Sequence, residues 1–139
     1  MPQGPGKLQG LRVLIVEDSF LIADTICEVL SECGCEIVGP APSLERGWQL
    51  SQQEGLDGAL LDVNLGGEFS FPIAITLTER GIPFLFLTGY DDLSVMPEEF
   101  RTVQRILKPF DFDELVAIVA GKFSANGRPS RPVSENCRD

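Results

Sequence analysis

The sequence predicts an α/β domain with a doubly wound, five-stranded parallel sheet, and three observations lead to that class. Five apolar runs alternate along the chain with segments whose apolar residues recur at helical spacing. The runs are apolar almost throughout, which is typical of parallel strands covered by helices on both faces. The 139 residues suffice for one domain with a single core. We therefore expect about five helices, and ligand sites at the carboxyl ends of the strands.

The first unit begins with an apolar run at residues 11–16, which only Arg12 interrupts. Residues 19–33 follow with apolar residues at helical spacing, and Gly34 is the expected C-cap of this helix. Residues 36–38 then predict a short second strand.

The second unit begins at Ser43, which is the expected N-cap of the next helix. We expect this helix to turn Leu44, Trp48 and Leu50 toward the core. Residues 56–63 form a longer apolar run and predict the third strand.

The glycines at residues 66–67 predict a loop after the third strand. A helix is expected over residues 71–80, where Pro72 suits the first turn. Residues 82–88 and 103–107 predict the fourth and fifth strands.

The sequence signals for a helix differ on the two sides of the fifth strand. Residues 91–101 are expected to form a short or mobile fourth helix, because Pro97 lies inside the segment. The last helix is predicted by a capping box, with Asp111 at the N-cap and Glu114 three residues later.

Composition and charge exclude several classes of function. Lys and Arg total 11 against 21 Asp and Glu, a formal net charge of −10, so we expect no binding to nucleic acid or to membranes. No histidine is present, which excludes Ser-His-Asp catalysis, and the four cysteines indicate reduced thiols in a cytoplasmic protein. Residues 1–9 and 124–139 are polar and are expected to be flexible tails around a domain at residues 10–123.

Acidic, hydroxyl and ammonium side chains follow four of the predicted strands. Glu17 and Asp18 follow the first strand, Asp62 the third, Thr88 the fourth and Lys108 the fifth. Because the carboxyl ends of parallel strands share one edge of a sheet, we expect these side chains to lie close together. Carboxylates this close would repel, and one would be protonated, unless a cation holds them ionised. Mg²⁺, which prefers oxygen ligands, is the cation that fits.

Four motifs at these strand ends resemble those of a known family. Their sequences are VLIVED at 13–18, LLDVNL at 60–65, LTG at 87–89 and LKPF at 107–110. In this order they are similar to the receiver domain of two-component response regulators, and the similarity extends over residues 11–123. The resemblance implies a flavodoxin-like sheet with strand order 2-1-3-4-5.

The resemblance also assigns roles to individual residues. Asp62 would accept a phosphoryl group from a phosphohistidine on a sensor histidine kinase or a histidine phosphotransfer protein. Asp18 would bind Mg²⁺ directly and Glu17 through water, while Asp62 and the backbone carbonyl of Asn64 would supply further oxygens. The protein would catalyse its own phosphorylation and dephosphorylation, so it would be a switch and not a conventional enzyme.

Two residues are implied to follow the phosphoryl group. Lys108 would pair with Asp62 and then with a phosphoryl oxygen, and the Lys108–Pro109 bond would be cis. Thr88 would hydrogen-bond another phosphoryl oxygen and move toward it. Many receivers carry an aromatic switch residue three positions before this lysine, but this chain has Arg105 there.

Residues 86–90, with the sequence FLTGY, instead resemble the FAT GUY subclass of receivers, whose signature is of the type Phe-Ala-Thr-Gly-x-Tyr. Tyr90 directly follows the glycine here and is our candidate for the signalling aromatic, with Thr88 as the other switch residue. Members of that subclass tend to have a mobile fourth helix and to work with HWE-type sensor kinases. A kinase of that type is therefore the partner that the resemblance implies.

Two other functions fit part of the pattern. A pseudo-receiver would bind partners without phosphorylation, but its usual mark, loss of the acceptor or of the acidic pair, is absent from this sequence. A Mg²⁺-dependent phosphohydrolase would need Asp-x-Asp, whereas this chain has Asp62-Val63-Asn64. The polar residues 124–139 are too few for a DNA-binding helix-turn-helix, so we expect the output to pass through a downstream protein. We also expect a monomer or weak dimer.

Overall fold

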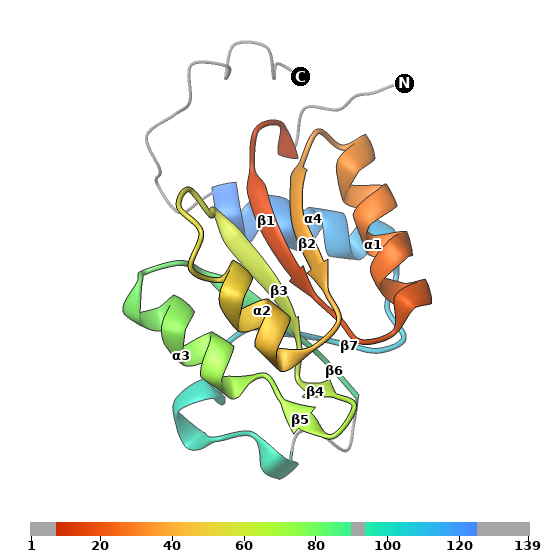
Figure 1. The fold of residues 1–139 in the computed structure, drawn as a ribbon. Coiled ribbons are helices and arrows are strands. Elements are labelled where there is room, and N and C mark those ends of the chain that lie inside the picture. Colours follow the sequence, from red (N-terminus) through yellow and green to blue (C-terminus); the bar gives the residue numbers. More distant parts are fainter. Residues whose placement is uncertain (1–7, 90–93, 125–139) are drawn as a thin grey trace.

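The computed structural model describes residues 8–89 and 94–124, which fold around a five-stranded sheet (Figure 1). In chain order its strands are β1 (Arg12–Val16), β2 (Glu36–Ala41), β3 (Gly58–Asp62), β6 (Phe84–Thr88) and β7 (Arg105–Leu107). Neighbouring strands pair in parallel in the order β2-β1-β3-β6-β7. This is the 2-1-3-4-5 arrangement, so the fold class expected from the sequence is confirmed.

Among the described residues, four α-helices pack on the two faces of the sheet. They are α1 (Phe20–Glu32), α2 (Leu44–Leu50), α3 (Phe71–Glu79) and α4 (Phe112–Ser124). α1 and α4 cover one face, and α2 and α3 cover the other (Figure 1). Ser19 Oγ caps α1 by accepting a hydrogen bond from Ile22 N at 3.4 Å. Ser43 Oγ caps α2 in the same way, from Arg46 N at 3.2 Å.

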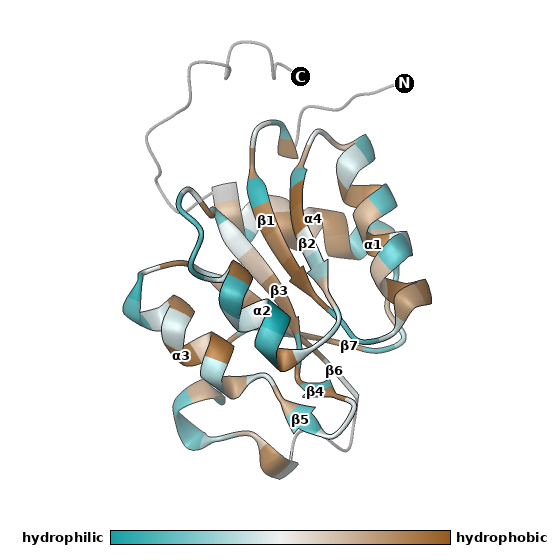
Figure 2. Cartoon of the chain, in the orientation of Figure 1, coloured by the Kyte–Doolittle hydropathy of each residue, from teal (hydrophilic) through white to brown (hydrophobic). Residues whose placement is uncertain are grey.

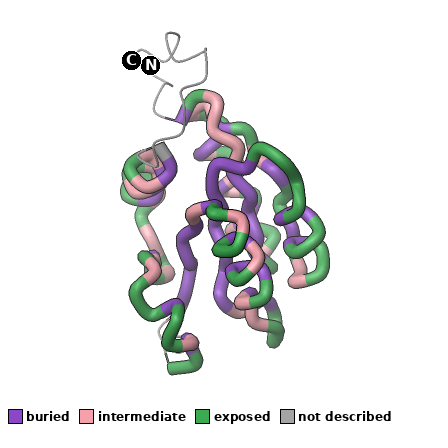
Figure 3. The backbone as a smooth tube through the Cα atoms, turned by 90° about the vertical axis from the view of Figure 1, so that its left-hand side faces the viewer, coloured by how far each residue is buried: buried purple, intermediate pink, exposed green. Residues whose placement is uncertain are grey.

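The alternation of side chains along the strands divides the core into two layers. In β1, Leu14 and Val16 contribute to the core under α2 and α3, whereas Val13 and Ile15 contribute to the core under α1 and α4. The strands are therefore buried on both sides (Figure 3), and hydrophilic residues lie mainly on the outer surfaces of the helices and in the loops (Figure 2). Because both faces are covered, polar groups can gather only at the ends of the strands.

The inward face of α2 differs from the prediction. The sequence predicts Trp48 in the core, but its side chain is 47% exposed, and that prediction is wrong. Gly47 lies against the sheet instead, where an added Cβ would be 2.7 Å from Ile73 Cδ1 and 3.1 Å from Val16 Cγ1. Successive residues of a helix are about 100° apart, so an approach on the side of Gly47 turns Trp48 outward. Leu50, one turn after Gly47, is buried as expected.

The connection between β6 and β7 contains no α-helix in its described part. Where the sequence predicts a short or mobile helix over 91–101, residues 94–101 hold only 3₁₀ turns, among them η3 (Glu98–Phe100). Pro97 has an extended backbone (φ −60°, ψ 149°), which prevents an α-helix from continuing through it. Phe100 nevertheless packs in the core under α2 and α3.

A short antiparallel hairpin follows β3 and was not predicted. It consists of β4 (Asn64–Leu65) and β5 (Glu68–Phe69), joined by a two-residue turn. Gly66 and Gly67 have φ values of +71° and +106° in this turn. Tight hairpins of this kind need positive φ at both central residues, which glycine adopts without strain. The glycine pair was thus interpreted correctly as a turn, but the strands beside it were missed.

We expect Gly58→Ala to destabilise the fold, because β3 and α4 approach closely at this residue. A Cβ on Gly58 would lie 2.5–2.6 Å from three ring carbons of Phe123, which is fully buried. Displacing that ring should lower the free energy of unfolding by about 1–3 kcal/mol, as measured by urea denaturation.

Gly121→Ala is the matched control, because it adds the same methyl group in α4, the helix that carries Phe123. A Cβ on Gly121 would meet nothing within 4 Å, and alanine favours helix by up to about 1 kcal/mol. The control should therefore be neutral or stabilising. Equal effects of the two substitutions would contradict the packing of Gly58 against Phe123.

Candidate functional site

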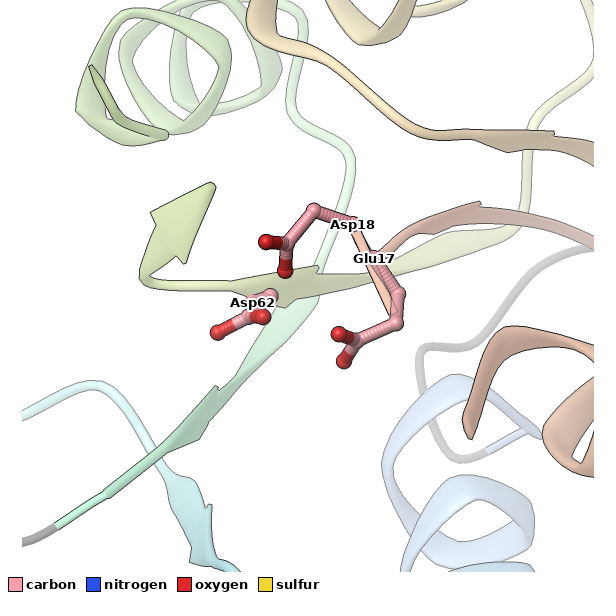
Figure 4. A group of neighbouring side chains, drawn as sticks. All are labelled: Glu17, Asp18 and Asp62. Carbon is pink, nitrogen blue, oxygen red and sulfur yellow. The ribbon is translucent and has the colours of Figure 1, made fainter. Parts of the chain in front are cut away.

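Three carboxylates meet at the carboxyl edge of the sheet (Figure 4). Glu17 and Asp18 directly follow β1, Asp62 is the last residue of β3, and these two strands are neighbours. One carboxylate oxygen of each residue lies within 4.8 Å of the others. Glu17 and Asp62 are buried, whereas Asp18 is exposed. The acidic residues that the sequence predicts at the strand ends are thus brought together.

Lys108 is the cation of this site. Its Nζ lies 3.0 Å from Asp62 Oδ2 and 3.1 Å from Glu17 Oε1. Lys108 follows β7, and its backbone N donates to the carbonyl oxygen of Thr88 at 2.8 Å, which ties its position to β6. The Lys108–Pro109 peptide bond is cis. The sequence indicated a pairing of Lys108 with Asp62 only, so the contact with Glu17 comes from the structure.

Charge is not balanced among these groups. Burial, followed by hydrogen bonding and like charge from the neighbouring Glu17 carboxyl, raises the pKa of Asp62 to about 8, although Lys108 acts in the opposite direction. Burial by itself would lower the pKa of the Lys108 ammonium, but Asp62 and Glu17 outweigh it and raise that pKa. One ammonium therefore does not suffice to keep the pKa of Asp62 in its usual range.

A hard divalent cation fits this donor set. Three carboxylates and one ammonium leave an excess of about two negative charges when all are ionised. The available donors are oxygens, which Mg²⁺ prefers, and the exposure of Asp18 leaves room for the water ligands that Mg²⁺ commonly keeps. The residues present therefore suit Mg²⁺ better than a soft metal, which would require thiolate or imidazole ligands.

Backbone groups hold the carboxylates in place. Ser19 N donates to Glu17 Oε2 at 3.0 Å, so the start of α1 orients that side chain. Asn64 N lies 3.4 Å from Asp62 Oδ1, and Asn64 Oδ1 accepts from Gly67 N at 2.8 Å within the hairpin. The β4–β5 hairpin, which the sequence pattern does not predict, is therefore part of the wall of this site.

The remaining predicted site residues lie on β6, on β7 and between them. Thr88 ends β6, is fully buried, and its Oγ1 donates to the carbonyl oxygen of Gly89 at 3.0 Å. Arg105 lies opposite Phe86 in the sheet and is half-buried. Tyr90, the expected signalling aromatic, lies outside the described residues.

Arg105 has a local structural role at the position where many receivers have an aromatic residue. Its Nη1 donates to the backbone oxygens of Arg101 at 3.1 Å and Val103 at 3.4 Å. The guanidinium therefore fastens the end of the β6–β7 connection to β7.

Comparisons with known proteins agree on one family. The chain matches the model of the response regulator receiver domain over residues 13–120. The sensory transduction protein LytT of Bacillus subtilis is 32% identical over 108 residues, which are 76% of this chain and 45% of that protein. This chain spans about half the length of the curated relatives it matches.

Solved structures with the same fold include two whose receiver-like chains are matched almost completely. SdrG from Sphingomonas melonis is 37% identical with a TM-score of 0.69, and the match covers 82% of this chain and 96% of SdrG. A CheY-like receiver domain protein from Methanospirillum hungatei is 25% identical with a TM-score of 0.73, and the match covers 86% of this chain and 96% of that one.

We expect Asp62→Asn to stabilise the metal-free protein. The pKa of Asp62 is raised from 3.8 to about 8 in the folded state. Between these values the folded protein retains a proton that the unfolded chain releases, so stability should fall as pH rises through this window. The amide cannot ionise, and the variant should gain about 1–2 kcal/mol near the upper end of the window. Urea denaturation in the presence of a chelator, over this pH range, measures both effects.

Asp24→Asn is the control for this experiment, because Asp24 is exposed on α1. It should change the free energy of unfolding by less than about 0.5 kcal/mol at any pH in the window. A wild type that does not lose stability with rising pH, or an Asp62→Asn variant that is no more stable than it, would contradict the charge imbalance.

Proposed function

The chain belongs to the response regulator receiver domain family, and from this premise we propose that it accepts a phosphoryl group on Asp62 and signals through contacts with other proteins. Receiver domains are the phosphoacceptors of two-component signalling, are phosphorylated by histidine kinases and bind Mg²⁺ at an acidic pocket. The observation that carries the assignment of Asp62 is its place between Lys108 Nζ, at 3.0 Å, and the carboxylates of Glu17 and Asp18.

The proposed reaction is an in-line displacement at phosphorus. A carboxylate oxygen of Asp62 forms a bond to the phosphoryl group of a phosphohistidine on the kinase, while the P–N bond breaks and the electron pair returns to the imidazole. Such a transition state needs positioning and charge neutralisation more than covalent assistance. Lys108 supplies one positive charge and can move from Asp62 to a phosphoryl oxygen.

Mg²⁺ would neutralise the charge that accumulates on the phosphoryl oxygens and on the acidic residues. We propose that Asp18 and Asp62 bind it directly, that Glu17 acts through water, and that the backbone carbonyl of Asn64 completes the protein ligands. The excess negative charge of this cluster supports that assignment.

The subclass and the switch are further parts of the proposal. We infer from residues 86–90 that the chain belongs to the FAT GUY receivers, with an HWE-type kinase as its phosphodonor. Thr88 and Tyr90 would transmit the change at Asp62. The absence of an aromatic at Arg105, and of an α-helix in the described part of the β6–β7 connection, support this route.

The surface beside the site suits a protein partner. Phe20 and Leu21 are 82% and 73% exposed at the start of α1, directly after the residues that form the acidic cluster. Because these two large apolar side chains are adjacent, they offer a partner a continuous apolar contact. A kinase that presents a phosphohistidine to Asp62 could bury both, which would hold the phosphoryl group at the site.

Other features bear on the setting of this reaction. No helix in the described part of the chain is long and apolar enough to span a lipid bilayer. The net charge of −10 disfavours contact with nucleic acid and with anionic lipid. We propose that the protein is cytoplasmic, acts as a monomer or weak dimer, and signals by binding a downstream protein.

Phosphotransfer tests the acceptor. We expect the wild type and Asp24→Asn to take up radiolabelled phosphate from candidate histidine kinases, and Asp62→Asn to take up none, because an amide oxygen is too poor a nucleophile. Unfolding curves establish that each variant is folded. Label retained by a folded Asp62→Asn variant would show that another residue is the acceptor.

Removal of a metal ligand tests the cation. In the wild type, Mg²⁺ at ten times its dissociation constant should raise the free energy of unfolding by about 1.4 kcal/mol. Asp18→Asn should reduce that gain to less than about 0.3 kcal/mol at the same concentration, because the neutral amide is a weaker ligand. Ca²⁺-free and Mg²⁺-free samples provide the baseline. An equal gain in both proteins would exclude Asp18 as a ligand.

A further inference from the structure

A groove between α3 and the β6–β7 connection lies apart from the acidic cluster. In Figure 1 the segment with η3 runs along α3, on the side away from α2. The groove has a volume of about 400 Å³, and its apolar lining comes from Ile75 on α3, Phe84 on β6, and Phe100 and Val103 of the connection. Ile75 is 42% exposed. The volume of the groove is in the range of natural ligand sites, and the apolar lining of the groove suits an apolar side chain.

The floor of this groove is rigid. The ring of Phe100 stacks on Phe71 at 6.0 Å and meets Phe84 and Phe86 edge to face at 6.1 Å and 5.7 Å. Phe71 also stacks on Phe69 of the hairpin at 5.5 Å. Rings that are held by several neighbours lose little freedom when a ligand covers them, so the groove is preorganised for binding.

The rim of the groove is acidic. Glu79 and Glu99 line it from opposite sides, and Glu98 is also exposed in η3. Neither Glu79 nor Glu99 forms a salt bridge within residues 8–89 and 94–124. Two arginines close in sequence bond elsewhere: Arg80 Nη1 donates to backbone oxygens after α2, and Arg101 Nε donates to the carbonyl oxygen of Met96.

We propose that this groove binds an amphipathic helical segment of a partner protein that carries Lys or Arg beside its apolar residues. An aliphatic or aromatic side chain of that segment would lie between Ile75 and Phe100, and its basic residues would face Glu79 and Glu99. Helices that bind in grooves use this combination of apolar anchors and flanking charge. The carboxylates select a basic segment over an acidic one by charge complementarity.

The surface is distinct from the site at Asp62, and the proposal does not require phosphorylation. Its test uses the unphosphorylated chain of 139 residues, without any phosphodonor. Failure of this test therefore leaves the assignment of Asp62 untouched, and failure of phosphotransfer leaves the groove untouched.

The probes are two sets of synthetic helical peptides of about 14 residues, with Leu or Phe anchors at helical spacing. One set carries Lys beside the anchors, and the other carries Glu at the same places. Binding is measured by titration of the ¹⁵N-labelled protein and mapped by amide chemical shifts. We expect a member of the Lys set to bind with a dissociation constant on the order of 10–100 μM and to shift residues of the groove, and the Glu set to bind at least about tenfold more weakly.

Variants distinguish binding in the groove from non-specific electrostatic attraction to an acidic protein. The double variant Glu79→Lys/Glu99→Lys should weaken binding by about tenfold or more, and Ile75→Ser by about fivefold. The matched control Glu28→Lys/Glu32→Lys makes the same change of net charge at exposed positions on α1, and it should weaken binding less than about twofold.

Several results would overturn the proposal. These are the absence of binding by every peptide of the Lys set, equal binding by the Glu set, an equal effect of the two double variants, or chemical shifts confined to another surface. Self-association that Ile75→Ser abolishes, detected by sedimentation velocity, would assign the groove to a second copy of this chain instead.

Discussion

Glu17 and Asp62 bury two carboxylates beside the single ammonium group of Lys108, and the structure around the carboxyl edge of the sheet is organised by that contact. The three residues come from the ends of three strands, so their contact fixes the relation of β1, β3 and β7 at this edge. The positive charge of Lys108 does not offset burial and the like charge of Glu17, and the pKa of Asp62 is therefore raised. A site that lacks positive charge in this way suits a cation. The fold tolerates the excess negative charge because the two core layers, one on each face of the sheet, stabilise it.

The elements around this edge connect the acidic cluster to the rest of the domain. Asn64 begins the hairpin and contacts Asp62, while Phe69 at the end of the hairpin stacks on Phe71 at the start of α3. Phe71 in turn stacks on Phe100 of the connection before β7. A contiguous set of packed groups therefore runs from the site to the groove beside α3. Energetic coupling between the two surfaces could pass through these contacts. It would require that the packed groups have a second arrangement that both surfaces favour or disfavour.

The β6–β7 connection is where this receiver differs from the common pattern. An aromatic side chain at the position of Arg105 could swing between two packed positions, whereas the guanidinium is bonded to two backbone oxygens of the same connection. Pro97 and the 3₁₀ turns leave this segment with few helical hydrogen bonds of its own. Phe100 nevertheless packs against Phe71, Phe84 and Phe86, and these contacts hold the described part of the connection to the core.

The sequence by itself determined the fold class and the composition of the site. Alternating apolar runs and helical patterns predict a parallel sheet, and the carboxyl ends of its strands must then share an edge. The grouping of Asp18, Asp62 and Lys108 therefore follows from the sequence. Tertiary structure decided what depends on close approach between distant residues. Gly47 lets α2 contact the sheet and turns Trp48 outward, which no periodicity shows. The second contact of Lys108, with Glu17, and the groove beside α3 likewise depend on side-chain volumes and distances that sequence spacing does not contain.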